Sequence, residues 1–321
     1  MNAPSTPSTP NARGTPGTSS ARAITIPGES GAGTLYTLLA ALGFGAVSTF
    51  TIIARGQGVS LPALLMWRYV IGAAVMVTFV ATRHYPRMPW REAMRWLVLG
   101  GGGQALLVGM ALSSLQYVTA ATTAFLFASY PVWVTAVQTI RGAEKVPARR
   151  TAALALGLGG IVVISGAPLS AVSPGADVWM GFALALGAAV VYGMYIPLMQ
   201  WMQKTHPVAV TSAYAKIGSA FCFLILALKD QSLSASFPAT AWMAIVGLAI
   251  FSTVLPSVFF LMGLMRLGPV RTAIVSMVEP FLTAMLAAVA IHQAISANAL
   301  LGGAMIVGAV VLLQFRRERV A

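Results

Sequence analysis

Long apolar segments recur along this chain, separated by short polar ones, and they limit its fold more than any other feature. A membrane core about 30 Å thick is crossed by roughly 20 apolar residues in helical form. Segments of this kind lie at 34–54, 61–82, 96–114, 118–139, 151–168, 178–200, 207–228, 239–261, 269–290 and 297–314. The stretches between them are too short for a separate soluble domain. The sequence therefore predicts an all-α polytopic membrane protein with ten transmembrane helices.

Composition and charge argue against an ordinary soluble enzyme. Charged residues make up 8% of the sequence, whereas about a quarter of a soluble domain is charged. With a cytoplasmic amino terminus, 16 of the 20 Lys and Arg residues fall on the cytoplasmic side, as the positive-inside rule requires. The net charge of +13 therefore reflects membrane topology and needs no nucleic-acid partner. We expect a multi-pass protein of the inner (plasma) membrane with both termini cytoplasmic.

The two ends of the chain differ from the apolar segments. Residues 1–30 are rich in Pro, Ser, Thr and Gly, which predicts a disordered cytoplasmic tail. Residues 315–321 form a basic cytoplasmic tail. Cys222 is the single cysteine, and no spacing of His, Cys or acidic residues indicates a metal site or a catalytic group. The sequence predicts neither an enzyme nor a bound cofactor.

The two halves of the chain resemble each other at a shift of roughly 145–149 residues. Five features of the first half recur in the same order in the second: Phe44-Gly45 and Tyr192-Gly193, Tyr69 and Tyr214, Trp96 with Gly101 and Trp242 with Gly247, Pro131 and Pro280, and Gly159 and Gly308. Five spans per repeat is an odd number, so the second copy enters the membrane from the opposite side. The sequence therefore predicts two inverted five-helix repeats, at 34–168 and 178–314, typical of alternating-access transporters.

Each repeat ends in a small-residue helix with a mid-span proline, a short loop and a glycine-rich helix. The motifs are Thr122-Thr123-Ala124, Tyr130-Pro131, Glu144 and Gly159 in the first repeat, and Thr272-Ala273, Glu279-Pro280, Gln293 and Gly308 in the second. This layout resembles the ten-helix EamA-like branch of the drug/metabolite transporter superfamily. The resemblance implies transport of a small molecule, without selecting the substrate. Gln293 departs from the acidic residue usual in the family, which weakens a functional role for that loop position.

Three ionisable residues lie well within predicted spans: Arg68, Lys216 and Glu279. A charge at mid-helix costs about 2.5–3.5 kcal/mol on insertion, so such residues face a bundle interior, a watery cavity or each other. Glu279 is ten residues into its span, about 15 Å deep and near the membrane midplane. It is a candidate to carry a coupling proton or to hold a cationic substrate group. The alternative is a structural ion pair with Lys216 or Arg68.

The remaining mid-span polar residues are weaker candidates for a substrate pathway. Lys216 is placed either to pair with Glu279 or to bind a substrate carboxylate, and Arg68 either to line the pathway or to extend to the membrane surface. Tyrosine and amide side chains that can orient a substrate are Tyr69, Tyr130, Tyr192, Tyr195, Tyr214 and Gln104. Four tryptophans near predicted span ends are interpreted as interfacial anchors: Trp90, Trp96, Trp179 and Trp201.

Together these features predict a secondary transporter that exports an amino acid or related metabolite by alternating access around a midplane site. A proton is a candidate coupling ion, and the oligomeric state, monomer or dimer, is left open. One alternative is an exporter of lipophilic drugs with a permissive apolar wall. Another is an intramembrane enzyme or sensor acting on lipid. A sugar-phosphate carrier ranks lower, because a dianion needs more than two buried cations.

Overall fold

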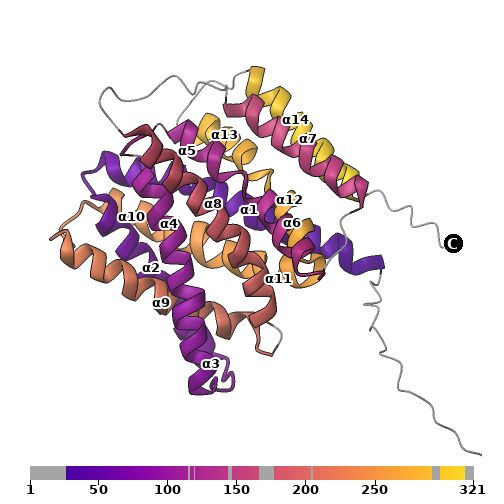
Figure 1. Ribbon diagram of the computed structural model, residues 1–321. Coiled ribbons are helices and arrows are strands. Elements are labelled where there is room, and N and C mark those ends of the chain that lie inside the picture. Colours follow the sequence, from indigo (N-terminus) through magenta and orange to yellow (C-terminus); the bar gives the residue numbers. More distant parts are fainter. Residues whose placement is uncertain are drawn as a thin grey trace, which may run out of the picture.

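A computed structural model describes residues 27–114, 116–118, 120–143, 147–165, 177–203, 205–290 and 297–314. Within these ranges the chain forms helices joined by short connections, and no strand is present. The helices gather into one bundle in which helices of the two halves alternate and pack on one another (Figure 1). The described part of the protein is therefore all-helical, as the sequence predicts.

Each half contributes the same series of helical segments. The first half consists of α1 (Pro27–Gly56), α2 (Leu61–Thr82), α3 (Trp90–Arg95), η1 (Trp96–Gly102), α4 (Gly103–Ser114), α5 (Ala120–Phe127), α6 (Tyr130–Ile140) and α7 (Ala148–Ser165). The second half consists of α8 (Val178–Met202), α9 (Val208–Lys229), α10 (Ala239–Ala249), η2 (Ile250–Val254), α11 (Leu255–Leu267), α12 (Pro269–Ser276), α13 (Glu279–Ala290) and α14 (Ala297–Gln314).

Six of the described helical stretches are long and apolar enough to cross a membrane: Gly31–Gly56, Leu61–Thr82, Trp90–Ser114, Val178–Met202, Val208–Lys229 and Ala239–Leu267. The predicted spans at 151–168 and 297–314 fall on the shorter helices α7 and α14. Those at 118–139 and 269–290 fall on the broken pairs α5/α6 and α12/α13. Length and composition thus identify six spans, and the total of ten stays a prediction.

The same two irregularities occur in both halves. The third long helix contains a π-helical turn, η1 in the first half and η2 in the second. The fourth helix is interrupted just before a proline, at residues 128–129 ahead of Pro131 and at 277–278 ahead of Pro280. Proline lacks a backbone N–H and disfavours a helical residue before it, so a helix tends to stop there. The two halves therefore share the same helix irregularities as well as the same sequence motifs.

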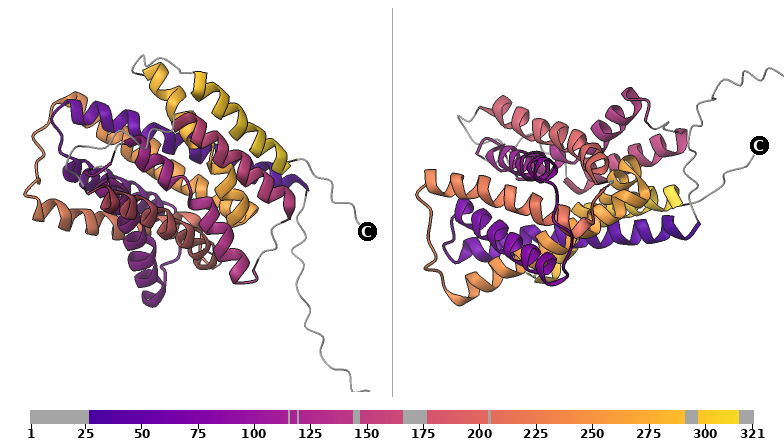
Figure 2. Two further views of the ribbon diagram at one scale, coloured as in Figure 1. Left: turned by 45° about the horizontal axis from the view of Figure 1, so that its top comes forward. Right: turned by 90° about the horizontal axis from the view of Figure 1, so that it is seen from below.

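The main helix contacts recur when the two halves are exchanged. Helix α1 packs on α11 and α13, and its counterpart α8 packs on α4 and α6. Two pairs join a helix to its own counterpart, α2 with α9 and α7 with α14. Figure 2 shows the start of α1 and the end of α14 at the same end of the bundle. This arrangement has the pseudo-two-fold relation expected of inverted repeats.

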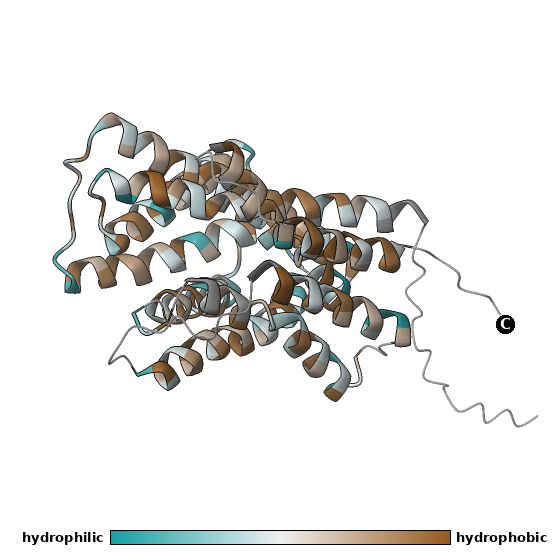
Figure 3. Cartoon of the chain, turned by 90° about the horizontal axis from the view of Figure 1, so that it is seen from above, coloured by the Kyte–Doolittle hydropathy of each residue, from teal (hydrophilic) through white to brown (hydrophobic). Residues whose placement is uncertain are grey.

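Apolar residues predominate along the helices, and many hydrophilic residues lie at helix ends and connections (Figure 3). Many of the large apolar side chains are exposed. Trp90, Trp179 and Trp201 are largely exposed near helix ends, as interfacial anchors are. Trp96 is only 2% exposed, so its assignment as an interfacial anchor is wrong. The reason is that the helix continues back to Trp90 instead of starting at residue 96, which places Trp96 farther inside the bundle.

The predicted terminal tails lie mostly outside the described residues. Helix α1 begins at Pro27, so the last four residues of the tail predicted at 1–30 are helical. Proline suits the first position of a helix, where its missing N–H has no partner to lose. Residues 1–26 and the basic tail at 315–321 are not among the described residues, and neither are the loop positions Glu144 and Gln293.

The halves approach closely where η1 crosses α9. A Cβ atom added to Gly101 would lie 2.6 Å from the backbone nitrogen of Ser219 and 2.7 Å from the carbonyl oxygen of Ala215. A Cβ atom added to Gly218 would collide with the carbonyl group of Leu97. Backbone therefore meets backbone at this crossing, which only glycine allows.

We expect Gly101→Ala to destabilise the protein by about 1–3 kcal/mol, because the added methyl group must push two helix backbones apart. The measurement is the thermal unfolding midpoint of the detergent-purified protein. Gly102→Ala is the matched control, since nothing lies within 4 Å of a Cβ atom at Gly102. Equal unfolding midpoints for the two variants would contradict the close crossing.

Candidate functional site

A cavity of about 330 Å³ lies between the two halves of the bundle. In the first half the described lining residues lie on α1, α2, η1, α4 and α5. In the second half they lie on α8, α9, α11 and α13. Most of the lining side chains are aliphatic or aromatic. The volume and the apolar lining with a few polar groups are typical of a small-molecule site.

Six of the eight pathway residues expected from the sequence line this cavity: Arg68, Tyr69, Gln104, Tyr192, Lys216 and Glu279. Tyr195, a further mid-span tyrosine, lines it as well. The other two are not among the lining residues. Tyr130 is buried, and its hydroxyl group donates to the Ala273 carbonyl at 3.3 Å. Tyr214 is half-buried against the hydrophobic core.

Lys216 is held on one wall of the cavity by an amide. Its Nζ atom donates to Oε1 of Gln104 at 3.1 Å and lies 5.5 Å from the centre of the Tyr69 ring. The Ser219 hydroxyl group shares the same Gln104 oxygen at 3.3 Å. An ammonium group has three N–H donors, so Lys216 keeps donors for a ligand.

Arg68 does not extend toward the membrane surface but contacts the π turn of the other half. Its Nε atom donates to Oγ1 of Thr253 at 2.5 Å, and its Nη2 atom donates to the Ser252 carbonyl at 3.2 Å. The first π turn is bound in a similar way, because the Tyr195 hydroxyl group donates to the Gly100 carbonyl at 2.8 Å. Each π turn thus accepts hydrogen bonds from cavity-lining side chains of the opposite half.

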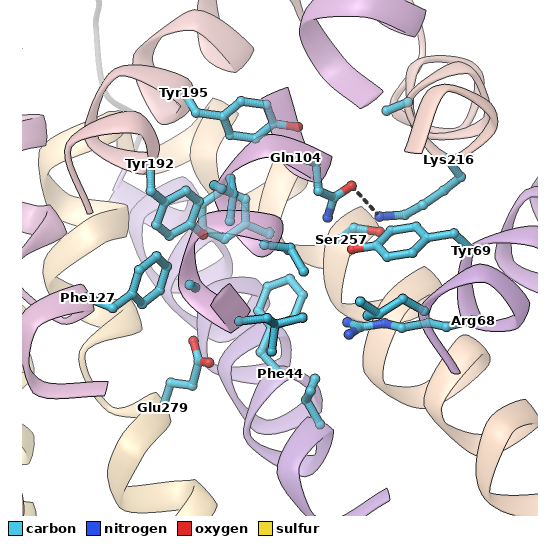
Figure 4. A pocket seen from close by; sticks show the side chains of 18 of the residues that line it. Phe44, Arg68, Tyr69, Gln104, Phe127, Tyr192, Tyr195, Lys216, Ser257 and Glu279 are labelled. Carbon is cyan, nitrogen blue, oxygen red and sulfur yellow. Dashed lines mark hydrogen bonds between the residues drawn. The ribbon is translucent and has the colours of Figure 1, made fainter. Parts of the chain in front are cut away.

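Glu279 lies across the cavity from both cations (Figure 4). It is the first residue of α13, directly after the break in the fourth helix. In the described part of the chain its carboxylate forms no ion pair, with Lys216, Arg68 or any other residue. Glu279 is therefore a cavity-facing acid available to a ligand or a proton.

Aromatic rings from four helices, α1, α5, α8 and α11, gather on the side of the cavity where Glu279 lies (Figure 4). The Tyr192 ring stacks on Phe127 with centroids 5.5 Å apart and on Phe260 at 6.4 Å. Phe44 also lines the cavity and meets Phe260 edge to face at 6.3 Å. These phenylalanines were not predicted from the sequence, since an apolar side chain in an apolar span carries no signal of its own. Phe44 alone was detectable, as the repeat counterpart of Tyr192.

We expect Thr253→Val to lower the unfolding midpoint by several degrees, because it leaves the buried Nε donor of Arg68 without an acceptor. An unsatisfied buried group of this kind costs about 1–3 kcal/mol. Thr82→Val is the control, since Thr82 is exposed and donates only to a carbonyl of its own helix. An unchanged midpoint in Thr253→Val would show that Arg68 does not depend on this acceptor.

Comparisons with known proteins agree with this architecture. The model of the EamA-like transporter family matches residues 31–166 and 179–315. An uncharacterized transporter of Archaeoglobus fulgidus is 24% identical over 208 residues, which cover 64% of this chain and 72% of that protein. The uncharacterized transporter YcbK of Bacillus subtilis is 24% identical over 268 residues, or 79% of this chain and 84% of that one.

A solved crystal structure has the same fold. It superposes with a TM-score of 0.74 at 22% sequence identity and covers 88% of this chain and 96% of its own. The two family matches together span most of the sequence and place one unit in each structural half. The chain therefore belongs to the EamA-like transporter family, as a multi-pass membrane protein built from two EamA units.

Proposed function

We propose that this protein exports an amino acid or a related small metabolite across the inner (plasma) membrane by alternating access. One observation carries the proposal: a 330 Å³ cavity between two pseudo-symmetric halves is lined by Arg68, Lys216 and Glu279. Charged side chains at membrane depth mark substrate or ion pathways. A metabolite with both charged and apolar parts matches a mostly apolar cavity with opposite charges on opposing walls.

The two halves supply the parts that alternating access requires. Helices of both halves line the cavity, whereas α7 and α14 pack on each other and contribute no residue to the described lining. If the two halves exchange conformations, the cavity closes toward one side and opens toward the other. Trp96 of the first π turn lines the cavity, as do Phe127 and Glu279 beside the two helix breaks, and π turns are frequent at functional sites. Both termini lie on the cytoplasmic side in this proposal.

Substrate identity is tested by an untargeted comparison of metabolites in cells that express or lack the protein. We expect at least one amino acid or related compound to accumulate in the medium when the protein is present and in the cell when it is absent. If no small molecule changes its distribution, the proposal of metabolite export fails.

Glu279 has a proposed coupling role, because it faces the cavity without a charged partner. We expect Glu279→Gln to reduce uptake of the identified metabolite into proteoliposomes by about tenfold or more, the effect of one lost charge-assisted contact. We also expect an imposed pH gradient to stop affecting uptake, since glutamine cannot exchange a proton. Asp177→Asn is the control: it removes an exposed carboxylate at the start of α8 and keeps a good helix cap. Unchanged transport with unchanged response to the pH gradient would make Glu279 a structural residue.

Export of lipophilic drugs is the second candidate, and the large apolar share of the cavity lining favours it. Such a cavity can accept varied ligands by contact with aromatic and aliphatic side chains. The test is a resistance profile in a host that lacks its own drug pumps. Resistance to several unrelated lipophilic compounds, with no change in metabolite export, would favour this candidate over the first.

A further inference from the structure

Two hydroxyl groups in the cavity wall have no hydrogen-bond partner. Tyr69 is fully buried and Ser212 is 2% exposed, and both line the cavity. Four buried hydroxyl groups have no hydrogen-bond partner in the described structure, and two of them, those of Tyr69 and Ser212, belong to residues that line the cavity. Buried polar groups are nearly always satisfied, so two unsatisfied hydroxyl groups at one cavity indicate a place where a ligand supplies the missing bonds.

We propose that Tyr69, Ser212 and Lys216 form a binding subsite for the carboxylate of the transported molecule. This inference rests on the proposed function, because it specifies which end of the metabolite is recognised and by which groups. Ser212 and Lys216 are four residues apart on α9, so their side chains share one face of that helix. The Tyr69 ring lies beside the Lys216 ammonium group, 5.5 Å from Nζ to the ring centre. Two residues with unpartnered hydroxyl groups and one cation therefore occupy neighbouring positions in the same wall of the cavity.

The charge around this wall favours an anion. Arg68 and Lys216 flank the Tyr69 ring, with the guanidinium carbon 5.3 Å from the ring centre. The acid among the described lining residues, Glu279, lies on the opposite side of the cavity (Figure 4). A carboxylate offers only acceptors, which match hydroxyl and ammonium donors. An ammonium group of the same ligand would be repelled here and attracted to Glu279.

The donors are held in place before the ligand arrives. Stacking on Phe223, with ring centroids 4.9 Å apart, fixes the Tyr69 ring. The hydrogen bond to Gln104 fixes the Lys216 ammonium group. Arg68 contributes its charge to the wall, while Nε and Nη2 of its guanidinium group bind the second π turn. A preorganised subsite binds more tightly because less side-chain freedom is lost.

The cavity limits the rest of the ligand. Apolar side chains such as Leu64, Leu107 and Val108 border the same cavity. A monocarboxylate with an apolar body therefore matches both the donor groups of the subsite and its apolar surroundings. A phosphate monoester carries a second negative charge, for which the wall has no further uncommitted cation among the lining residues described. We therefore infer monocarboxylates as the ligand class and treat phosphate esters as a competing outcome.

The inference is tested by equilibrium binding to the detergent-purified protein, read as the shift in its thermal unfolding midpoint. The probes are apolar amino acids, phenylpropionate and octanoate, each beside its methyl ester, with hexyl phosphate as the dianionic probe. We expect at least one acid to stabilise the protein at millimolar concentration and its ester to do so at least about tenfold more weakly, since a hydrogen bond to a charged group is worth that much.

The variants Tyr69→Phe and Ser212→Ala each remove one hydroxyl group. We expect each to weaken binding of the acid about tenfold and to leave the binding of the ester unchanged. Without ligand, neither variant should lower the unfolding midpoint, because the lost hydroxyl group had no partner. Tyr36→Phe and Ser232→Ala are the controls, since they remove the same groups away from the cavity lining, and they should bind the acid as the native protein does.

Three results would overturn the carboxylate subsite: acid and ester binding equally well, hexyl phosphate binding more tightly than every acid, or no stabilisation by any acid of the panel. Losses in Tyr69→Phe and Ser212→Ala no larger than in the controls would also overturn it. None of these results bears on whether a metabolite moves across the membrane. That movement is measured independently by comparing the metabolites of cells with and without the protein. Failure of the subsite and failure of the export proposal are therefore distinguishable.

Discussion

Backbone hydrogen bonding without water is the constraint on which this structure depends. Inside a bilayer every carbonyl group needs a partner from the protein, yet both third helices contain a π turn. Side chains of the opposite half meet this need: Arg68 donates to Ser252, and Tyr195 and Ser219 donate to Gly100 and Gly101. Both π turns are thus stabilised by hydrogen bonds between the two halves.

The same contacts explain how three ionisable residues are tolerated within the bundle. Arg68 binds a π turn and Lys216 binds Gln104, while Glu279 stands without an ion pair across the cavity (Figure 4). The two cations and the acid are therefore separated by the cavity and do not neutralise one another directly. The separated charges give the cavity a positive side and a negative side, which suits a molecule that carries a positive and a negative group.

Much of the fold could be predicted because insertion into a membrane depends on local composition. Apolar length located the helices, and the recurrence of glycines and prolines located the repeat. Helix breaks before Pro131 and Pro280 were less apparent, since membrane helices often contain proline without stopping. Trp96 was misplaced because the helix continues through Arg95 and Arg91 to Trp90. A pattern based on hydrophobicity alone ends a span at such charges.

The candidate site was predictable where a residue was unusual for its surroundings. Arg68, Lys216, Glu279 and the mid-span Tyr69 are costly or polar within apolar spans, and the cavity brings all four together. Ser212 and Phe127 have no such signal, because small hydroxyl groups and aromatic rings are common in membrane helices. By itself the sequence determined the helical membrane class, the two repeats and the chemical groups at membrane depth. Only the tertiary structure decided which groups face one cavity and which are already paired, because these depend on how the two halves pack.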